Sequence, residues 1–83
     1  MNREKSELYQ NRFGINLKKE LDQKGYTQME LAGCIGVSRM AVSRWVSGKQ
    51  EPNIFDAYKI AKELGVTLER LTRKPLAEDI SFS

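Results

Sequence analysis

Three basic side chains are the residues of this chain best suited to chemistry, because Arg39, Arg44 and Lys49 follow one another at intervals of five. The stretch 31–50 contains no acidic residue, so no carboxylate lies between these three cations in the sequence. Such a surface suits contact with phosphate groups, although charge alone fits a solvated helix face equally well. The interpretation therefore depends on the elements that present these side chains.

Helix-capping residues and apolar periodicity predict five helices and almost no strand. The first helix starts at about Ser6 or Asn11 and ends at Lys24, before a glycine. The other four follow residues that can cap a helix N-terminus, namely Thr27 (in a capping box with Glu30), Ser38, Asn53 and Thr67, and they end near Gly36, Gly48, Gly65 and Leu71. We therefore expect an all-α fold, a compact five-helix bundle.

The expected domain organisation is a polar N-terminal segment at 1–10 that can extend the first helix, a helical domain at 11–72 and a C-terminal tail at 73–83. The tail is either flexible or in contact with a second subunit, since Ile80 and Phe82 alternate with polar residues as in a strand. The core is expected from one apolar face of each helix. Its members would be Phe13, Leu17, Leu21, Leu31, Ile35, Val42, Trp45, Phe55, Ala57, Tyr58, Ile60, Ala61 and Leu64.

Composition excludes several function classes. A chain of 83 residues has room for one compact core, and it contains no histidine, no glycine-rich phosphate loop and no cluster of metal ligands. The acidic side chains are expected on solvated helix faces, so we expect no enzyme and no cofactor. No signal peptide or membrane span is recognisable, and the single cysteine, Cys34, fits a cytoplasmic protein. Positive charge is concentrated in residues 1–50, with nine Lys or Arg against five Asp or Glu.

The stretch Gln28–Ser47, QMELAGCIGVSRMAVSRWVS, has the residue types that a helix-turn-helix requires. Ala32 is small where the two helices cross, and Gly36 can adopt the left-handed turn between them. With Val42 and Trp45 directed inward, the outer arc of the third helix must carry its polar residues. Such a helix is expected to enter the DNA major groove as a rigid unit.

The segment from Leu17 to Leu71 resembles the phage repressor and Cro-like helix-turn-helix family, of the xenobiotic-response-element type. The matching residues are Gly25, Thr27, Gln28, Glu30, Leu31, Ala32, Gly36, Val37, Ser38, Val42, Ser43, Arg44, Trp45, Gly48, Lys49, Pro52, the run Ala61–Val66, Leu68 and Leu71. The resemblance implies a five-helix bundle that binds palindromic double-stranded DNA as a dimer.

Site residues follow from this resemblance. The expected base-reading residues are Arg39, Met40, Ser43 and Arg44, because arginine can bind guanine O6 and N7 and methionine can pack on a thymine methyl group. The expected phosphate contacts are Thr27, Gln28, Ser38, Ser47 and Lys49.

The function expected from the sequence is a transcriptional regulator that binds double-stranded DNA, a repressor acting as a homodimer on a palindromic operator. Subunit contacts are expected around Leu68, Leu71 and the tail, because the third helix must stay accessible. The alternative is a DNA-binding antitoxin or interaction module whose tail engages a protein partner through Leu76, Ile80 and Phe82.

Overall fold

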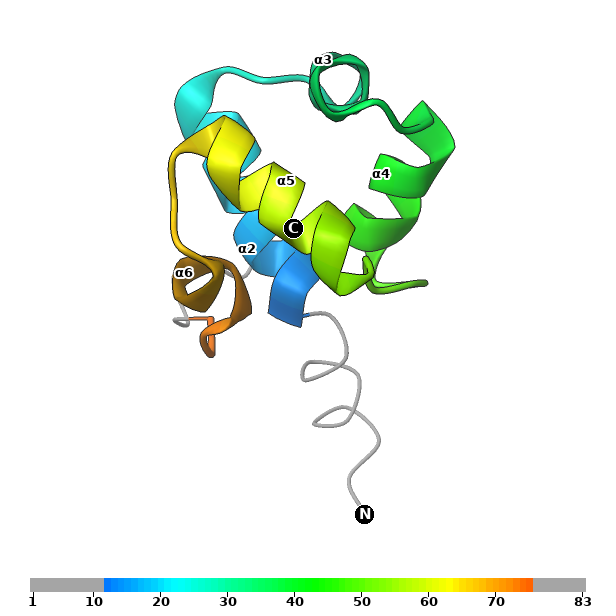
Figure 1. The fold of residues 1–83 in the computed structure, drawn as a ribbon. Helices are drawn as coiled ribbons and strands as arrows, with labels where there is room; N and C mark the ends of the chain where they lie inside the picture. Colours follow the sequence, from blue (N-terminus) through cyan, green and yellow to red (C-terminus); the bar gives the residue numbers. More distant parts are fainter. Residues whose placement is uncertain (1–11, 76–83) are drawn as a thin grey trace.

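A computed structural model of the chain describes residues 12–75, and within that range it contains helices but no strand. The helices are α2 (Arg12–Lys24), α3 (Gln28–Ile35), α4 (Arg39–Ser47), α5 (Ile54–Leu64) and α6 (Leu68–Thr72). Figure 1 shows α3 and α4 at one end of the bundle, α5 in front of α2, and α6 at the opposite end. The expected all-α bundle is confirmed. The N-terminal segment 1–10, the start of the first helix and the tail beyond Pro75 lie outside the described residues.

The predicted N-caps of α3 to α6 are confirmed. In each case the side-chain oxygen accepts a hydrogen bond from a backbone N–H three residues later, at 2.8–3.1 Å, and the four capping residues are Thr27, Ser38, Asn53 and Thr67. In the capping box the backbone N–H of Thr27 also donates to Glu30 Oε1 at 2.9 Å, which lowers the pKa of the Glu30 carboxyl. The chain reverses after α3 and α4 through Gly36 and Gly48, with φ of 74° and 78°. Local sequence therefore fixes where these helices begin and end.

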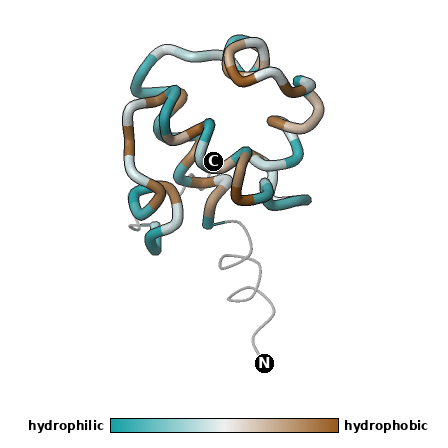
Figure 2. Tube along the Cα trace, viewed as in Figure 1, coloured by the Kyte–Doolittle hydropathy of each residue, from teal (hydrophilic) through white to brown (hydrophobic). Residues whose placement is uncertain are grey.

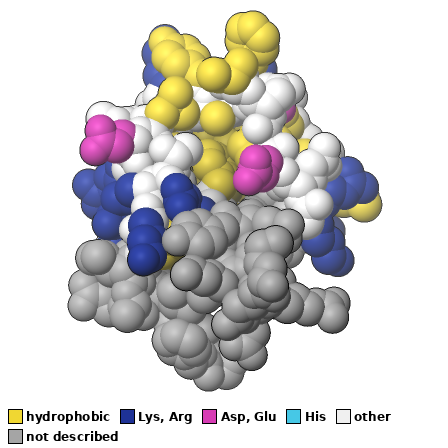
Figure 3. All heavy atoms as spheres, turned by 90° about the horizontal axis from the view of Figure 1, so that it is seen from below, with side chains coloured by type: hydrophobic (Ala, Val, Ile, Leu, Met, Phe, Trp, Pro, Cys, Tyr) yellow, Lys and Arg dark blue, Asp and Glu magenta, His cyan; other side chains and the backbone are white. Residues whose placement is uncertain are grey.

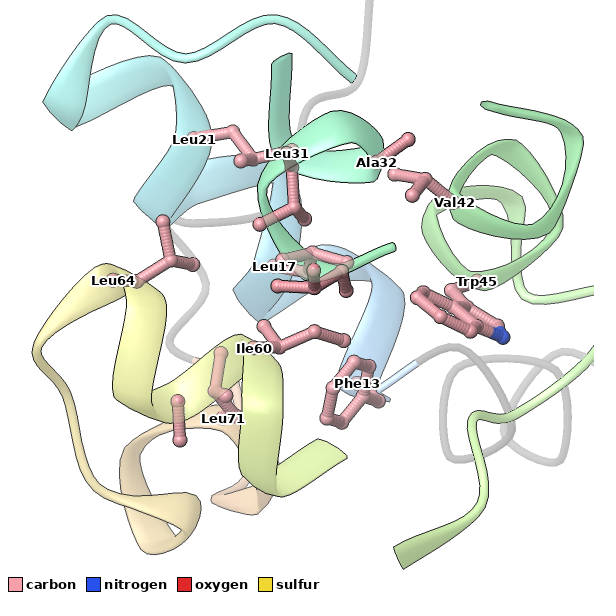
Figure 4. Packing of buried hydrophobic residues seen from close by; sticks show 12 residues of the cluster. Phe13, Leu17, Leu21, Leu31, Ala32, Val42, Trp45, Ile60, Leu64 and Leu71 are labelled. Atoms are coloured by element: carbon pink, nitrogen blue, oxygen red, sulfur yellow. The ribbon is translucent and has the colours of Figure 1, made fainter. Parts of the chain in front are cut away.

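The core lies where α2, α3, α4 and α5 converge. Hydrophobic and hydrophilic positions alternate along the helices, as Figure 2 shows, and the hydrophobic ones meet inside. Leu17 of α2 is completely buried and in Figure 4 lies among Leu31, Trp45 and Ile60, which come from three different helices. The predicted inward direction of Val42 and Trp45 is confirmed, since both are buried.

Two aromatic residues of α5 do not belong to the core. Phe55 is 75% exposed and Tyr58 is 57% exposed, so their assignment to the buried face is wrong. Each residue advances a helix by roughly 100°, so Phe55, nine positions before Leu64, lies on the opposite side of the helix. The buried face of α5 consists of Ile60, Ala61 and Leu64. Hydrophobic character alone therefore misassigned side chains that the helical phase directs outward.

The subunit contacts expected around Leu68, Leu71 and the tail stay a prediction, since the tail lies outside the described residues. Leu71 is completely buried and Leu68 is half-buried against the core. Leu71 holds α6 onto the bundle and is inaccessible to a second subunit.

Buried polar groups attach α6 to α2. Asn16 Nδ2 donates hydrogen bonds to the carbonyl oxygens of Leu71 and Arg73, at 2.9 and 2.8 Å. Glu20 is only 1% exposed, which contradicts the expectation that the acidic residues lie on solvated faces. Its carboxylate accepts from Arg70 Nε at 2.8 Å and from Lys24 Nζ at 3.1 Å. Burial by itself raises the pKa of Glu20, but the hydrogen bonds and charges of Arg70 and Lys24 outweigh it, and the pKa is lowered.

We predict that Glu20→Gln lowers the free energy of unfolding by about 1–3 kcal/mol near neutral pH, because Arg70 and Lys24 lose a buried ionised acceptor. Because the pKa of Glu20 is lower in the folded chain, its contribution is present above the unfolded pKa of about 4.3 and is lost as the pH falls through the folded pKa. Denaturant unfolding at several pH values should show wild type and variant converging in acid.

The matched control is Asp22→Asn on the same helix. Asp22 pairs with Lys18 at the same spacing, but both side chains are largely exposed, so the change should stay below about 1 kcal/mol. Equal effects of the two substitutions would contradict a buried role for Glu20.

Candidate nucleic-acid interface

The pair α3 and α4 forms one rigid unit. Backbone N–H groups of Gly36 and Val37 both donate to the carbonyl oxygen of Ala32 at 3.0 Å, which fixes the turn between the helices. Ala32 is buried where α3 packs against α4, and α4 also packs against α2. With Val42 and Trp45 buried beneath it, α4 is held from two sides and its outer arc faces solvent.

The outer arc of α4 carries a shallow hollow of about 270 Å³. Its lining residues are Arg39, Met40, Ser43, Arg44, Ser47 and Lys49. All six are exposed, and Met40 is 59% exposed in spite of its apolar side chain. The lining contains three cations and no carboxylate. The structure thus brings the four predicted base-reading residues together with two of the predicted phosphate contacts, although their roles remain predictions.

The loop after α4 is fastened to the end of that helix. The carbonyl oxygen of Arg44 accepts hydrogen bonds from the backbone N–H groups of Lys49 at 3.0 Å and Gln50 at 3.3 Å, and from Ser47 Oγ at 3.2 Å. Lys49 is therefore held beside the hollow. No sequence pattern could have identified this anchor, since every residue type supplies a backbone carbonyl.

Arg39 and Lys49 lie at opposite ends of the hollow. Arg39 is the first residue of α4, and Lys49 follows its C-cap Gly48. A helix of nine residues is about 13 Å long, so side chains at its two ends can meet different chemical groups of one extended ligand.

The other three predicted phosphate contacts lie at helix N-termini and do not line the hollow. The oxygens of Thr27 and Ser38 are engaged in capping, although each hydroxyl keeps a proton that it can donate. Gln28 is the half-buried first residue of α3, at the end of the helix where backbone N–H groups attract anions. Thr27 and Ser38 therefore stabilise helix N-termini, whatever else they bind.

A metal-binding cluster and a membrane-spanning helix are both absent from residues 12–75. That range holds no group of three His, Cys, Asp or Glu side chains arranged to bind a metal ion. None of its helices combines the length and the apolar character that crossing a membrane requires.

Comparison with known proteins finds helix-turn-helix proteins. A family model described as helix-turn-helix matches residues 17–71. The chain is 34% identical over 61 residues to an SPbeta prophage-derived uncharacterized HTH-type transcriptional regulator, YonR, of Bacillus subtilis, an alignment that covers 74% of this chain and 56% of that protein. It is 39% identical over 59 residues to the HTH-type transcriptional activator BcrR of Enterococcus faecalis, with 71% and 29% covered. The chain thus spans between about a third and about half of the length of these relatives.

We predict that Thr27→Ala lowers the free energy of unfolding by about 1 kcal/mol, because α3 loses its capping oxygen. Thr27→Ser keeps the oxygen and should retain most of the stability. Gln28→Ala, one position along, removes no cap and should leave the thermal melting temperature close to that of the wild type. Melting curves of the three variants test the assignment, which fails if Thr27→Ala melts like Gln28→Ala.

Proposed function

The chain belongs to the helix-turn-helix family of the phage repressor and Cro type, and we propose that it is a transcriptional regulator that binds double-stranded DNA in a sequence-specific manner. The observation that carries the proposal is the hollow on α4, in which three cations, two hydroxyls and one exposed methionine are assembled on a helix packed against the core and on the loop that follows it. One matched relative is named as a transcriptional regulator and the other as a transcriptional activator, which supports a role in transcription for this chain.

In the proposed complex α4 lies in the major groove. Arg39 and Arg44 donate to guanine O6 and N7, Met40 packs on a thymine methyl group, and Ser43 reaches a neighbouring base edge. These contacts specify sequence, because each base pair presents its own pattern of donors and acceptors in that groove.

Contacts to the DNA backbone fix the depth and the register of α4. Lys49 and Ser47 bind phosphates at the far end of the hollow, and Gln28 with the N-terminus of α3 binds another. The hydroxyls of Thr27 and Ser38 donate to phosphate while their oxygens keep their capping hydrogen bonds. Phosphate contacts add affinity that is independent of sequence and decreases with salt.

The proposed form on DNA is a homodimer on a palindromic operator. One recognition helix reads only a few base pairs, and two of them together reach useful specificity in a genome. The half-sites should be centred about 10 bp apart, one helical turn of DNA. Occupancy of an operator that overlaps a promoter excludes polymerase, so we propose repression. The alternative of an antitoxin or interaction module depends on Leu76, Ile80 and Phe82, which lie outside the described residues.

Selection of duplexes from a random-sequence library by the full chain tests this function. The proposal expects an enriched inverted repeat with the stated spacing, and a reporter placed downstream of that sequence should lose expression when the protein is present. Recovery of random sequence would remove the proposed function, whereas a rise in reporter expression would overturn repression alone.

We predict that Arg39→Ala and Lys49→Ala weaken DNA binding in different ways. Arg39→Ala should weaken binding to the selected duplex by about 1–3 kcal/mol per half-site and relax preference at one base pair, with little effect on scrambled DNA. Lys49→Ala should weaken both duplexes alike, and it should reduce the slope of log K against log salt by about one unit for each phosphate that the variant no longer binds. Titrations at several salt concentrations measure both quantities.

Lys18→Ala provides the control, because Lys18 is an exposed cation of α2 that does not line the hollow. It should change neither base preference nor the salt slope. An equal loss of affinity for selected and scrambled DNA in Arg39→Ala would make Arg39 a backbone contact and leave base reading to Met40, Ser43 and Arg44.

A further inference from the structure

Five large hydrophobic side chains of the described surface are more than half exposed, namely Met29, Met40, Ile54, Phe55 and Tyr58. Figure 3 shows hydrophobic side chains gathered at one edge of the face that it presents, with Lys and Arg side chains elsewhere on the same face. Two of the five are methionines, and their thioether sulfur reacts with oxidants. Met29 is 65% exposed and Met40 is 59% exposed, so an oxidant in solution reaches both.

The two methionines have different surroundings. Met40 lies on α4 in the hollow, which is also lined by three cations and two hydroxyls. Met29 is the second residue of α3 and does not line the hollow. The two sulfur atoms are therefore similar in access to solvent, but only one of them lies where the proposed function places DNA.

We propose that Met40 is a modification site, and that its oxidation to methionine sulfoxide by a hydroperoxide weakens the binding of DNA. The inference rests on the proposed function, in which Met40 packs on a thymine methyl group. In the reaction an S–O bond forms while the O–O bond of the peroxide breaks, and a proton moves from the transferred oxygen to the departing one. With hydrogen peroxide the sulfur is oxidised by two electrons and the peroxide is reduced to water. Reductases reverse this change, so the site acts as a switch.

The sulfoxide does not fit the place that the thioether occupies. The thioether is apolar, whereas the sulfoxide is polar and its oxygen accepts hydrogen bonds. In the major groove thymine presents its methyl group and the O4 acceptor, so it has no donor for that oxygen. Oxidised Met40 would lose the water around its oxygen without gaining a hydrogen bond from thymine, which is unfavourable.

The new oxygen also competes for a donor that DNA needs. Arg44 follows Met40 by four residues, a separation at which side chains meet on a helix surface. The guanidinium of Arg44 has only donors, and the sulfoxide oxygen at position 40 is an acceptor within its reach. Among the described residues no carboxylate lines the hollow, so the sulfoxide oxygen meets no stronger acceptor there. Oxidation therefore diverts Arg44 from guanine.

Cys34 is the other sulfur-containing type of side chain in the described range, and it is exposed on α3. Loss of hydration raises the pKa of the Cys34 thiol, and the carboxylates of Glu63 and Glu30 raise it further. A raised pKa leaves less of the thiolate, which is the reactive form. Cys34 does not line the hollow, so Cys34→Ser removes thiol oxidation from the test without altering the proposed site.

The test measures the affinity of Cys34→Ser protein for the selected duplex before and after hydrogen peroxide. Peptide mass spectrometry should find one added oxygen on Met29 and on Met40, and the affinity should fall at least about tenfold per half-site, as expected for the loss of one base contact. Methionine sulfoxide reductase should restore the affinity. Circular dichroism and melting curves of the treated protein verify that it remains folded.

Two substitutions in the same background assign the effect to one sulfur. Met40→Leu should have the same affinity with and without peroxide, whereas Met29→Leu should lose as much affinity as its parent. Each variant is compared with itself, so the effect of the substitution on the untreated affinity cancels. Arg44→Ala should lose a smaller factor than its parent, because the sulfoxide then has no guanidinium to divert.

Oxidation rates give a second measurement, which needs no substitution at position 40. When the protein is bound to the selected duplex, the groove covers Met40, and its oxidation should slow in proportion to the bound fraction. Met29 should be oxidised at the same rate with and without DNA. An unchanged rate for Met40 in the complex would overturn its place in the groove and, with it, the proposed switch.

The outcomes separate this inference from the proposed function. Complete oxidation of Met40 without loss of affinity would overturn the switch and leave DNA binding intact, as would equal losses in Met40→Leu and its parent. An equal loss in Arg44→Ala and its parent would overturn the competition for Arg44. Untreated protein that prefers no duplex would instead remove the proposed function, and the switch with it.

Discussion

The inward packing of α4 is the constraint on which the rest of the structure depends. A helix of nine residues is too short to persist alone in water, so α4 exists because Val42 and Trp45 are buried against α2 and α3. Once those two side chains point inward, the helical phase determines the direction of every other side chain of α4. The hollow, its cations and its exposed methionine are thus consequences of what lies beneath them. Any side chain that displaced Trp45 would change the direction in which Arg39 points.

The local sequence was sufficient to predict where the helices begin and end. A capping oxygen and its backbone donor are three residues apart, so both partners are visible in one short stretch of sequence, as for Thr27 and Glu30. The position of α4 residues was predictable for a related reason, since two inward positions determine the phase of the whole helix. Helical phase does not decide whether or where each of those residues contacts DNA, so their individual roles stay predictions.

Features that depend on distant partners were not predictable. Glu20 was expected among the solvated acids because Arg70, which neutralises it, is fifty positions away in the sequence. Phe55 was expected in the core because aromatic residues usually are buried, and only the packing of Ile60 and Leu64 shows that it faces outward. The carbonyl oxygen of Arg44 has no signature in sequence at all. In each case the missing information was three-dimensional proximity, which neither composition nor periodicity contains.

The residues that line the hollow and the residues that cap helices differ in how freely they can be substituted. Arg39, Met40 and Ser43 are exposed, none of them caps a helix, and the core does not include them. Under the proposed function, a single substitution among them can move the preferred operator without endangering the fold. Under that function, the set of genes that such a protein controls can change while its fold is kept. Thr27 and Ser38 cannot be substituted as freely, because each caps a helix.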